Sequence, residues 1–228
     1  MGGQACVLYG AAEFSRDTDL ALLASPHNLK QLSAALHALG ASVIAVPPFE
    51  LQYLERGHAV HFAYDDPEAG RMRLDVMARM RNVDPFPTLW EHRTTLVLEG
   101  VGAVEVLSLP DLAASKKTQR DKDWPMLRRL VEVNYLTHRD EATDPRVEFW
   151  LLELRTPALL IEAADRFGER GRQLSTRRPL LTDALARRAD HVAAGLAREE
   201  ALERAADQVY WVPLRAELEA LRRRLRRG

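Results

Sequence analysis

Three aspartates in the first third of the chain are the residues best suited to chemistry. Asp17 and Asp19 are two positions apart, so on a strand both carboxylates would point to the same face. Asp75 stands between Leu74 and Val76, where a carboxylate must face a cleft or find a partner, because burying it alone is costly. Carboxylates that lie close together repel one another and persist most easily around a divalent cation. If the strand of Asp75 lies beside that of the other two, three carboxylates converge and can hold two Mg²⁺ ions for in-line phosphoryl transfer.

A glycine pair near the start of the chain supplies a complementary feature. Gly2 and Gly3 precede a segment of small and apolar residues, 4–10, that we expect to form a short helix. Glycines at a helix N-terminus let the backbone approach a ligand closely and direct free N–H groups toward an anion. The triphosphate oxygens of a nucleotide are the natural anion for such a turn.

A purely structural interpretation of the aspartates also stays open. In it each carboxylate is a cap or an ion-pair partner: Asp17 caps the element that follows, Asp19 pairs with Arg16, and Asp75 pairs with Arg73 or Arg71. Two histidines, His58 and His61, add no metal site, because a spacing of three on a strand points them to opposite faces. The chain has no Gly-x-Ser-x-Gly motif, no P-loop and no dinucleotide-binding glycine fingerprint.

The elements that must position these residues follow from hydrophobic periodicity and turn signals. Strands are predicted at 18–23, 43–46, 58–64, 72–77, 95–98 and 103–107. Helices are predicted at 26–39, 87–92, 111–117, 124–136, 149–167, 180–196 and 199–225. Ser25-Pro26 is a helix start signal and Gly40 a stop signal, while Pro157 should interrupt one helix and Pro213 should kink or break the last.

Strands and helices that alternate first, with helices alone afterwards, predict an α+β fold. We expect a mixed sheet flanked by helices, followed by an α-helical C-terminal region. The corresponding domains would be a catalytic domain at 1–115 and a helical region at 116–228 that selects an acceptor or binds a partner.

The composition of the chain limits the classes of protein to which it can belong. The chain has 228 residues, of which 46% are hydrophobic, so it can bury a core. No apolar run is long enough for a membrane span, no secretory signal is readable, and the single cysteine excludes an internal disulfide, so a cytoplasmic protein is expected. Residues 1–115 hold 8 Lys and Arg against 14 Asp and Glu, and residues 116–228 hold 24 against 19. An acidic half for metal and a basic half for phosphate would explain this asymmetry, as would the solvated faces of arginine-rich helices.

The order of these motifs resembles a known family. Gly-Gly, then Asp-x-Asp on a strand, then an isolated Asp on a later strand is similar to the pattern of the DNA polymerase beta superfamily of nucleotidyltransferases. The closest resemblance is to small bacterial nucleotidyltransferases of the abortive-infection and toxin–antitoxin type. The segments 107–117, LSLPDLAASKK, and 120–123, RDKD, also look like theirs, and the resemblance covers about residues 2–135.

The resemblance implies a role for each residue of the two motifs. Gly2 and Gly3 would hold the nucleotide phosphates. Asp17 and Asp19 would ligate both Mg²⁺ ions, and Asp75 would complete the second metal site and help to activate the attacking hydroxyl.

The later segment would supply positive charge. Lys116 would neutralise the triphosphate, with Lys117 as the competing choice, and Arg120 would join it in nucleotide binding. Asp123 would orient Lys116 or Arg120. Two departures stand out: the chain starts on the glycine turn, where the family usually has a preceding strand or helix, and Gly-Gly replaces the frequent Gly-Ser, which leaves Gln4 as the nearest side chain.

The implied function is Mg²⁺-dependent transfer of a nucleoside monophosphate from an NTP to an acceptor hydroxyl, with release of pyrophosphate. The acceptor would be a tRNA 3′ end or other RNA, a protein side chain or a small molecule. The alternative is a catalytically inactive nucleotide- or partner-binding protein of the same fold, as one component of a toxin–antitoxin pair with a protein antitoxin as its partner.

Overall fold

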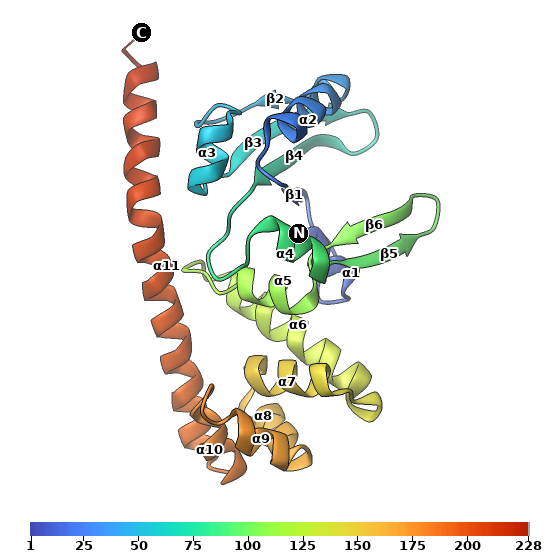
Figure 1. Cartoon of the computed structure of the whole chain (residues 1–228), viewed down its shortest axis with the longest axis vertical. Helices are drawn as coiled ribbons and strands as arrows, with labels where there is room; N and C mark the ends of the chain where they lie inside the picture. The colour runs from blue at the N-terminus through green and yellow to red at the C-terminus, as the bar shows by residue number, and fades with distance from the viewer. Residues whose placement is uncertain (228) are drawn as a thin grey trace. The chain divides into compact units, whose positions relative to one another are not determined.

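The computed structural model describes residues 1–227, which divide into two compact units. Unit 1 comprises Met1–Leu8, Ala12–Ser115 and the chain from Gln208 onward, and unit 2 comprises Tyr9–Ala11 and Lys116–Asp207. The predicted α+β class is confirmed. A mixed four-stranded sheet with helices occupies the N-terminal half, and a mostly helical region ending in a long helix follows (Figure 1).

The main sheet of unit 1 has the strand order β1-β4-β3-β2. β1 (Asp17–Ala21) runs parallel to β4 (Gly70–Met77). β3 (Val60–Asp66) runs antiparallel to β4 on its other side and to the short edge strand β2 (Ser42–Val43). The strand of Asp75 therefore lies directly beside the strand of Asp17 and Asp19, the arrangement that convergence of the three carboxylates requires.

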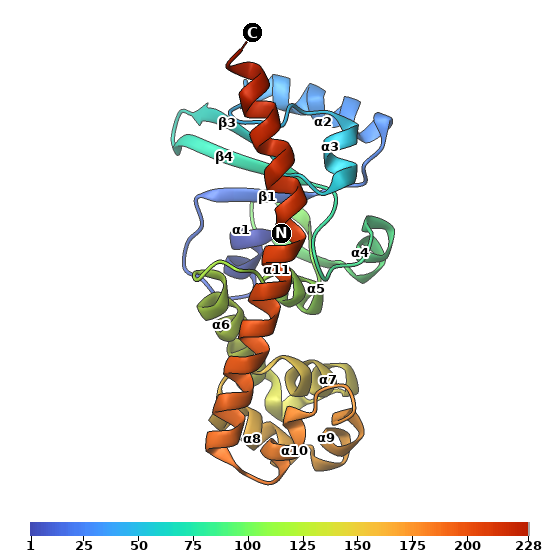
Figure 2. The same ribbon diagram turned by 90° about the vertical axis from the view of Figure 1, so that its left-hand side faces the viewer.

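One face of this sheet is the core of unit 1. Val60, Phe62, Leu74 and Val76 are buried there, and Leu54 packs with them. The helices α2 (Pro26–Ala38) and α3 (Leu51–Arg56) lie on this side, as Figures 1 and 2 show. Because successive side chains of a strand alternate between the two faces, the residues between these apolar positions point away from the helices.

The predicted start and end of α2 are both confirmed. The Ser25 hydroxyl accepts a hydrogen bond of 3.2 Å from the Asn28 backbone N–H, and Pro26 occupies the first turn. At the other end Gly40 has a φ of +66°, which a residue with a side chain rarely adopts. The Gly40 and Ala41 N–H groups donate back to carbonyls of the last turn, which is a Schellman ending.

The remaining elements of unit 1 are short. They are α1 (Gly2–Leu8), α4 (Phe86–His92), a separate antiparallel pair of β5 (Thr94–Leu98) and β6 (Gly102–Val106), and α5 (Leu109–Ser115). The sequence predicted strands close to β5 and β6 but no helix at α3, which is only six residues long.

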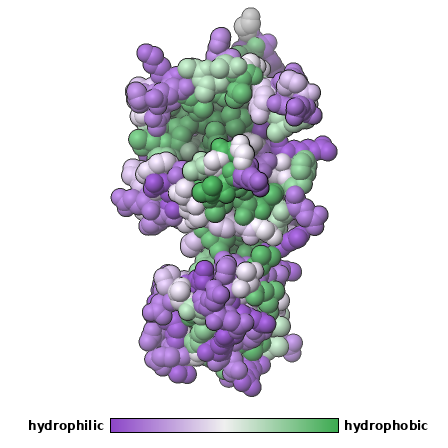
Figure 3. Space-filling model, turned by 90° about the vertical axis from the view of Figure 1, so that its right-hand side faces the viewer, coloured by the Kyte–Doolittle hydropathy of each residue, from purple (hydrophilic) through white to green (hydrophobic). Residues whose placement is uncertain are grey.

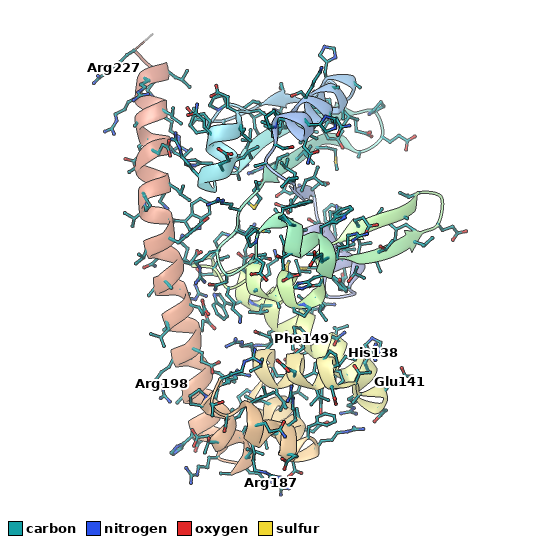
Figure 4. The ribbon with its side chains drawn as sticks, in the orientation of Figure 1. His138, Glu141, Phe149, Arg187, Arg198 and Arg227 are labelled. Atoms are coloured by element: carbon teal, nitrogen blue, oxygen red, sulfur yellow. The ribbon has the colours of Figure 1, made fainter. Side chains whose placement is uncertain are left out.

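Unit 2 is a cluster of helices around aromatic side chains. The helices are α6 (Asp123–His138), the 3-10 turn η1 (Arg139–Glu141), α7 (Asp144–Glu153), α8 (Pro157–Arg166), α9 (Gly168–Leu174), α10 (Leu180–Leu185) and the first part of α11 (Ala189–Leu225). Trp150 is fully buried against Tyr135, with ring centroids 5.2 Å apart in an edge-to-face arrangement. Figure 4 labels Phe149 on α7 and His138 at the end of α6.

The predicted boundary between the last two helices, at residues 196–199, is wrong. The predicted helix 180–196 is broken between α10 and α11, where Arg187, labelled in Figure 4, has a φ of 54°. At Pro213, where a kink or a break was predicted, the helix does not break, because α11 continues through this residue. A proline removes the hydrogen bond to the carbonyl four residues earlier, here that of Val209. Val209 is 72% exposed, so water can satisfy its carbonyl and the helix tolerates the loss.

The predicted interruption at Pro157 is confirmed, because α7 ends at Glu153 and α8 begins at Pro157.

The surface of the two units differs in character on the face drawn in Figure 3. There, hydrophilic side chains dominate the helices of unit 2, and hydrophobic side chains gather over unit 1. Among the helices of residues 1–227, none is long and apolar enough to cross a membrane.

Candidate active site

The three aspartates meet on the polar face of the main sheet. In the parallel register of β1 and β4, Asp19 is the direct partner of Asp75, and Asp17 is the partner of Arg73. In the antiparallel register of β3 and β4, His61 is the partner of Asp75. Residues paired in this way point to the same side. The structure therefore brings three carboxylates, one guanidinium and one imidazole together on the face opposite the core.

Asp75 is already engaged by its neighbours. Arg73 donates from Nε to Oδ1 at 2.8 Å and from Nη2 to Oδ2 at 3.0 Å, a two-pronged contact. His61 Nδ1 lies 2.8 Å from Oδ1. Burial opposes ionisation, but the hydrogen bonds from His61 and Arg73 outweigh it, so the pKa of Asp75 lies below its ordinary value. The pairing with Arg73 is one that the structural interpretation of the sequence named.

His61 is a site residue that the sequence analysis did not include. Its Nδ1 is also 3.1 Å from Arg73 Nη2. One ring nitrogen cannot satisfy both contacts, because it must carry a proton to donate to Asp75 and lack one to accept from Arg73. Donation to an ionised carboxylate is the stronger bond, so we assign the proton to Nδ1 and the contact to Asp75.

Arg73 is the only cation among the five residues whose charge does not depend on pH. Its hydrogen bond to Asp75 raises the pKa of Arg73 most, burial opposes the rise, and the charges of Asp75, Asp17 and Asp19 add to it. Its guanidinium thus interacts with all three carboxylates. It offsets one of their three negative charges.

The glycine pair packs against the first aspartate strand. The two glycines are the first residues of α1 and do not precede the helix, which corrects the predicted start. A Cβ added to Gly2 would lie 1.8 Å from Asp19 Oδ2, and one added to Gly3 would lie 2.3 Å from Ser15 Oγ. Gly2 also has a φ of +69°. Glycine is therefore required at Gly2 by both the contact with Asp19 and the backbone conformation, whereas a side chain at Gly3 would require the Ser15 hydroxyl to move.

Gln4, the first side chain after the glycine pair, is also turned toward this strand entry. Its Nε2 donates to the Ser15 carbonyl at 2.8 Å, and the Ser15 hydroxyl donates to the Asp17 carbonyl at 3.0 Å. These bonds fix the turn that leads into β1. They position the Asp-x-Asp segment relative to α1.

Lys116, Arg120 and Asp123 form a second group, within unit 2. Arg120 donates to Asp123 from Nε at 2.9 Å and from Nη2 at 3.1 Å, and Lys116 Nζ lies 3.7 Å from the same carboxylate. The Thr118 hydroxyl donates to it at 2.6 Å. Burial opposes ionisation of Asp123, but the bonds from Arg120 and Thr118 and the charge of Lys116 outweigh it and lower the pKa of Asp123. Asp123 thus contacts both of the cations that it was expected to orient.

Lys117, the competing candidate for the triphosphate, pairs with Glu153 at 2.7 Å within unit 2. Lys116 is buried, whereas the side chain of Arg120 is largely exposed. Of the three cations named in this segment, Arg120 is the most accessible to a ligand.

A metal ion would find suitable donors on the sheet face but not a finished site. Carboxylate oxygens are the ligands that Mg²⁺ prefers, and Asp17, Asp19 and Asp75 share one face. Within residues 1–227, however, no group of three or more His, Cys, Asp and Glu side chains is arranged to hold a metal. Both oxygens of Asp75 are turned to Arg73. A cation that binds Asp75 therefore competes with Arg73 for the same carboxylate.

Comparison with known proteins adds no further constraint. No protein-family model matches the chain, and no curated protein is significantly similar to it. The function of the site is therefore inferred from its own residues.

Proposed function

We propose that the chain is a Mg²⁺-dependent nucleotidyltransferase of the DNA polymerase beta type. It would transfer a nucleoside monophosphate from an NTP to an acceptor hydroxyl. The observation that supports this most is the alignment of Asp19 with Asp75 across a parallel strand pair, with Asp17 on the same face. The close packing of Gly2 on the carboxylate of Asp19 also supports it, because it brings the glycine turn and the Asp-x-Asp strand into one site.

In this proposal the acceptor oxygen attacks the α-phosphorus. A bond forms from that oxygen to phosphorus, the bond to the bridging oxygen breaks, and pyrophosphate leaves with the electron pair. Asp17 and Asp19 would hold divalent cations, which when bound neutralise phosphate charge and favour the deprotonated hydroxyl. Asp75 is ionised at neutral pH, since its pKa is lowered, and would complete the second cation site and orient the acceptor hydroxyl. The hydroxyl proton passes to solvent.

The residues of the later segment complete the proposal. Lys116 and Arg120 would stabilise the triphosphate, with Asp123 holding both cations in place. The basic second half of the chain suits an RNA acceptor such as a tRNA 3′ end, because phosphate neutralisation provides most of the affinity for nucleic acid. A protein side chain or a small molecule with a hydroxyl is the other acceptor class. A cytoplasmic setting and a protein antitoxin as partner belong to the same proposal.

Calorimetry with the four NTPs, with and without Mg²⁺, tests this function. The Asp17→Asn/Asp19→Asn variant removes two charges from the site with little change of shape. The variant Asp84→Asn/Glu99→Gln removes two charges from exposed positions of the same unit and is its control. We expect Mg²⁺-dependent binding by the wild type and the control, and none by the first variant. A folded wild type that binds no NTP would refute the proposal.

A second candidate is a protein that binds nucleotide or a partner without turnover. The engagement of both Asp75 oxygens by Arg73 favours it, because a catalytic carboxylate must become available to its ligand. Release of pyrophosphate distinguishes the two. Nucleotide binding without pyrophosphate release, across RNA, protein and aminoglycoside acceptors, would select the inactive binding protein.

A further inference from the structure

The contact between Arg73 and Asp75 has the features of an internal substitute for a metal ion. Two N–H groups of Arg73 donate to one oxygen each of Asp75, at 2.8 and 3.0 Å, and Arg73 is also the direct partner of Asp17 in the parallel register. A guanidinium satisfies carboxylates by the same attraction that a divalent cation would use, but with a single positive charge.

The solvent exposure of the Arg73 side chain allows it to move away from Asp75. Its side chain is 44% exposed, whereas that of Asp75 is 13% exposed, so the arginine is the mobile partner and the carboxylate the fixed one. Asp75 keeps its bond to His61 when the arginine departs, so the carboxylate stays oriented. A long side chain on a half-exposed strand position can rotate toward solvent without disturbing the core.

We propose that Arg73 is the resident counter-cation of Asp75, a gate that competes for this carboxylate until a divalent cation and an anionic ligand arrive together. This inference rests on the proposed function, because the anionic ligand it names is the phosphate chain of the nucleotide. The metal ion alone binds weakly, since it must displace the arginine and then lies next to a like charge. Metal with nucleotide binds more tightly, because the phosphates give the displaced guanidinium a new bidentate partner.

The proposal makes metal binding and nucleotide binding mutually dependent. If nucleotide strengthens metal binding through Arg73, metal must strengthen nucleotide binding by the same factor. Neutralising the arginine removes the competition for Asp75, so metal alone binds better. It also removes the new phosphate contact, so the coupling shrinks.

Titration with Mn²⁺, followed by the paramagnetic resonance signal of the free ion, tests this without any activity measurement. The variants are Arg73→Gln and, as a matched control, Arg71→Gln, which removes the same charge from the same strand two residues farther from Asp75. Each titration is made with and without a nucleotide that has a non-hydrolysable bond between its α- and β-phosphates. Circular dichroism and thermal unfolding establish that all three proteins are folded.

We expect Arg73→Gln to bind Mn²⁺ alone about tenfold more tightly than the wild type or Arg71→Gln. A change in affinity of this size is expected when one positive charge is removed from the immediate neighbourhood of a bound cation. The gain in Mn²⁺ affinity on adding nucleotide should be smaller in Arg73→Gln than in the other two proteins. Equal Mn²⁺ affinities in all three proteins, with nucleotide binding intact, would overturn the role of Arg73 and leave the proposed function standing. Tighter Mn²⁺ binding by Arg73→Gln with no nucleotide binding in any protein would support the displacement of Arg73 by metal and overturn the nucleotide function. Absence of Mn²⁺ and nucleotide binding in every protein would overturn both.

Discussion

Arg178 is the side chain whose loss should cost unit 2 the most stability. It is 5% exposed and follows α9 in the chain. It donates to the carbonyls of Leu151 and Leu154 at 2.9 and 3.0 Å, at the C-terminal end of α7. It also donates to both oxygens of Glu199 on α11, at 3.0 and 2.8 Å. Arg155 donates to the same carboxylate at 2.6 Å. One guanidinium therefore joins three segments of the unit.

The cost of Arg178→Leu can be worked out from these contacts. A buried acceptor left without a donor costs about 1–3 kcal/mol, and two carbonyls lose theirs. Breaking one side of a buried ion pair adds to this, although Arg155 limits the penalty by remaining on Glu199. Burial of the new leucine side chain returns part of the loss. The expected net decrease in the free energy of unfolding is about 4 kcal/mol.

The neighbouring residue provides a matched control. Arg177 pairs with Glu148, but its side chain is 59% exposed. An exposed pair contributes about 0–1 kcal/mol, so Arg177→Leu should have little effect. Urea unfolding followed by tryptophan fluorescence includes unit 2, because Trp124 and Trp150, two of the four tryptophans, are buried there. If the two variants lose the same free energy of unfolding, or Arg178→Leu loses less than about 1 kcal/mol, the reasoning from buried hydrogen bonds is wrong.

Two further predictions concern the glycine turn and the buried aspartate of unit 2. Gly2→Ala places a Cβ against the carboxylate of Asp19 and also strains a positive φ, whereas Gly40→Ala strains a positive φ in open space. Gly40→Ala should therefore cost about 1 kcal/mol in urea unfolding and Gly2→Ala clearly more, and equal losses would show that the contact with Asp19 is unimportant. Asp123 has a pKa below its usual value of 3.8, so the unfolded chain takes up its proton first as the pH falls. The stability from Asp123 is fully present above that value and is lost as the pH falls through the folded pKa, so Asp123→Asn should flatten the acid side of the stability profile measured by unfolding at a series of pH values. An unchanged acid slope would contradict the assignment.

Local signals in the sequence were sufficient for much of the fold. The alternation of polar and apolar residues around Asp75 predicted a strand with one buried face, and β4 has its core residues Leu74 and Val76 on that face. Ser25-Pro26 and Gly40 predicted both ends of α2, because a cap needs only residues within one turn.

Contacts that depend on strand register could not be read with the same certainty. The pairing of His61 with Asp75 follows once the hairpin turn is centred on Glu68, but the turn residues alone did not fix that centre. From the sequence alone, Arg73 and Arg71 were equal candidates for the partner of Asp75. The structure shows that Arg73 is the partner of Asp75, and the strand register shows that Arg73 also lies opposite Asp17. A break was one of the two outcomes predicted at Pro213, because the sequence does not show that α11 exposes Val209, whose carbonyl loses its donor there.

The alternation of polar and apolar residues along β4 means that the hydrophobic core also fixes the register of the site. A slip of one residue would turn Leu74 and Val76 to the polar side and bury Arg73 and Asp75 among apolar side chains, which is far too costly to persist. The same hydrophobic pattern that stabilises unit 1 therefore disfavours any register shifted by an odd number of residues. Accuracy in the placement of Asp75 is enforced by residues that never touch a ligand.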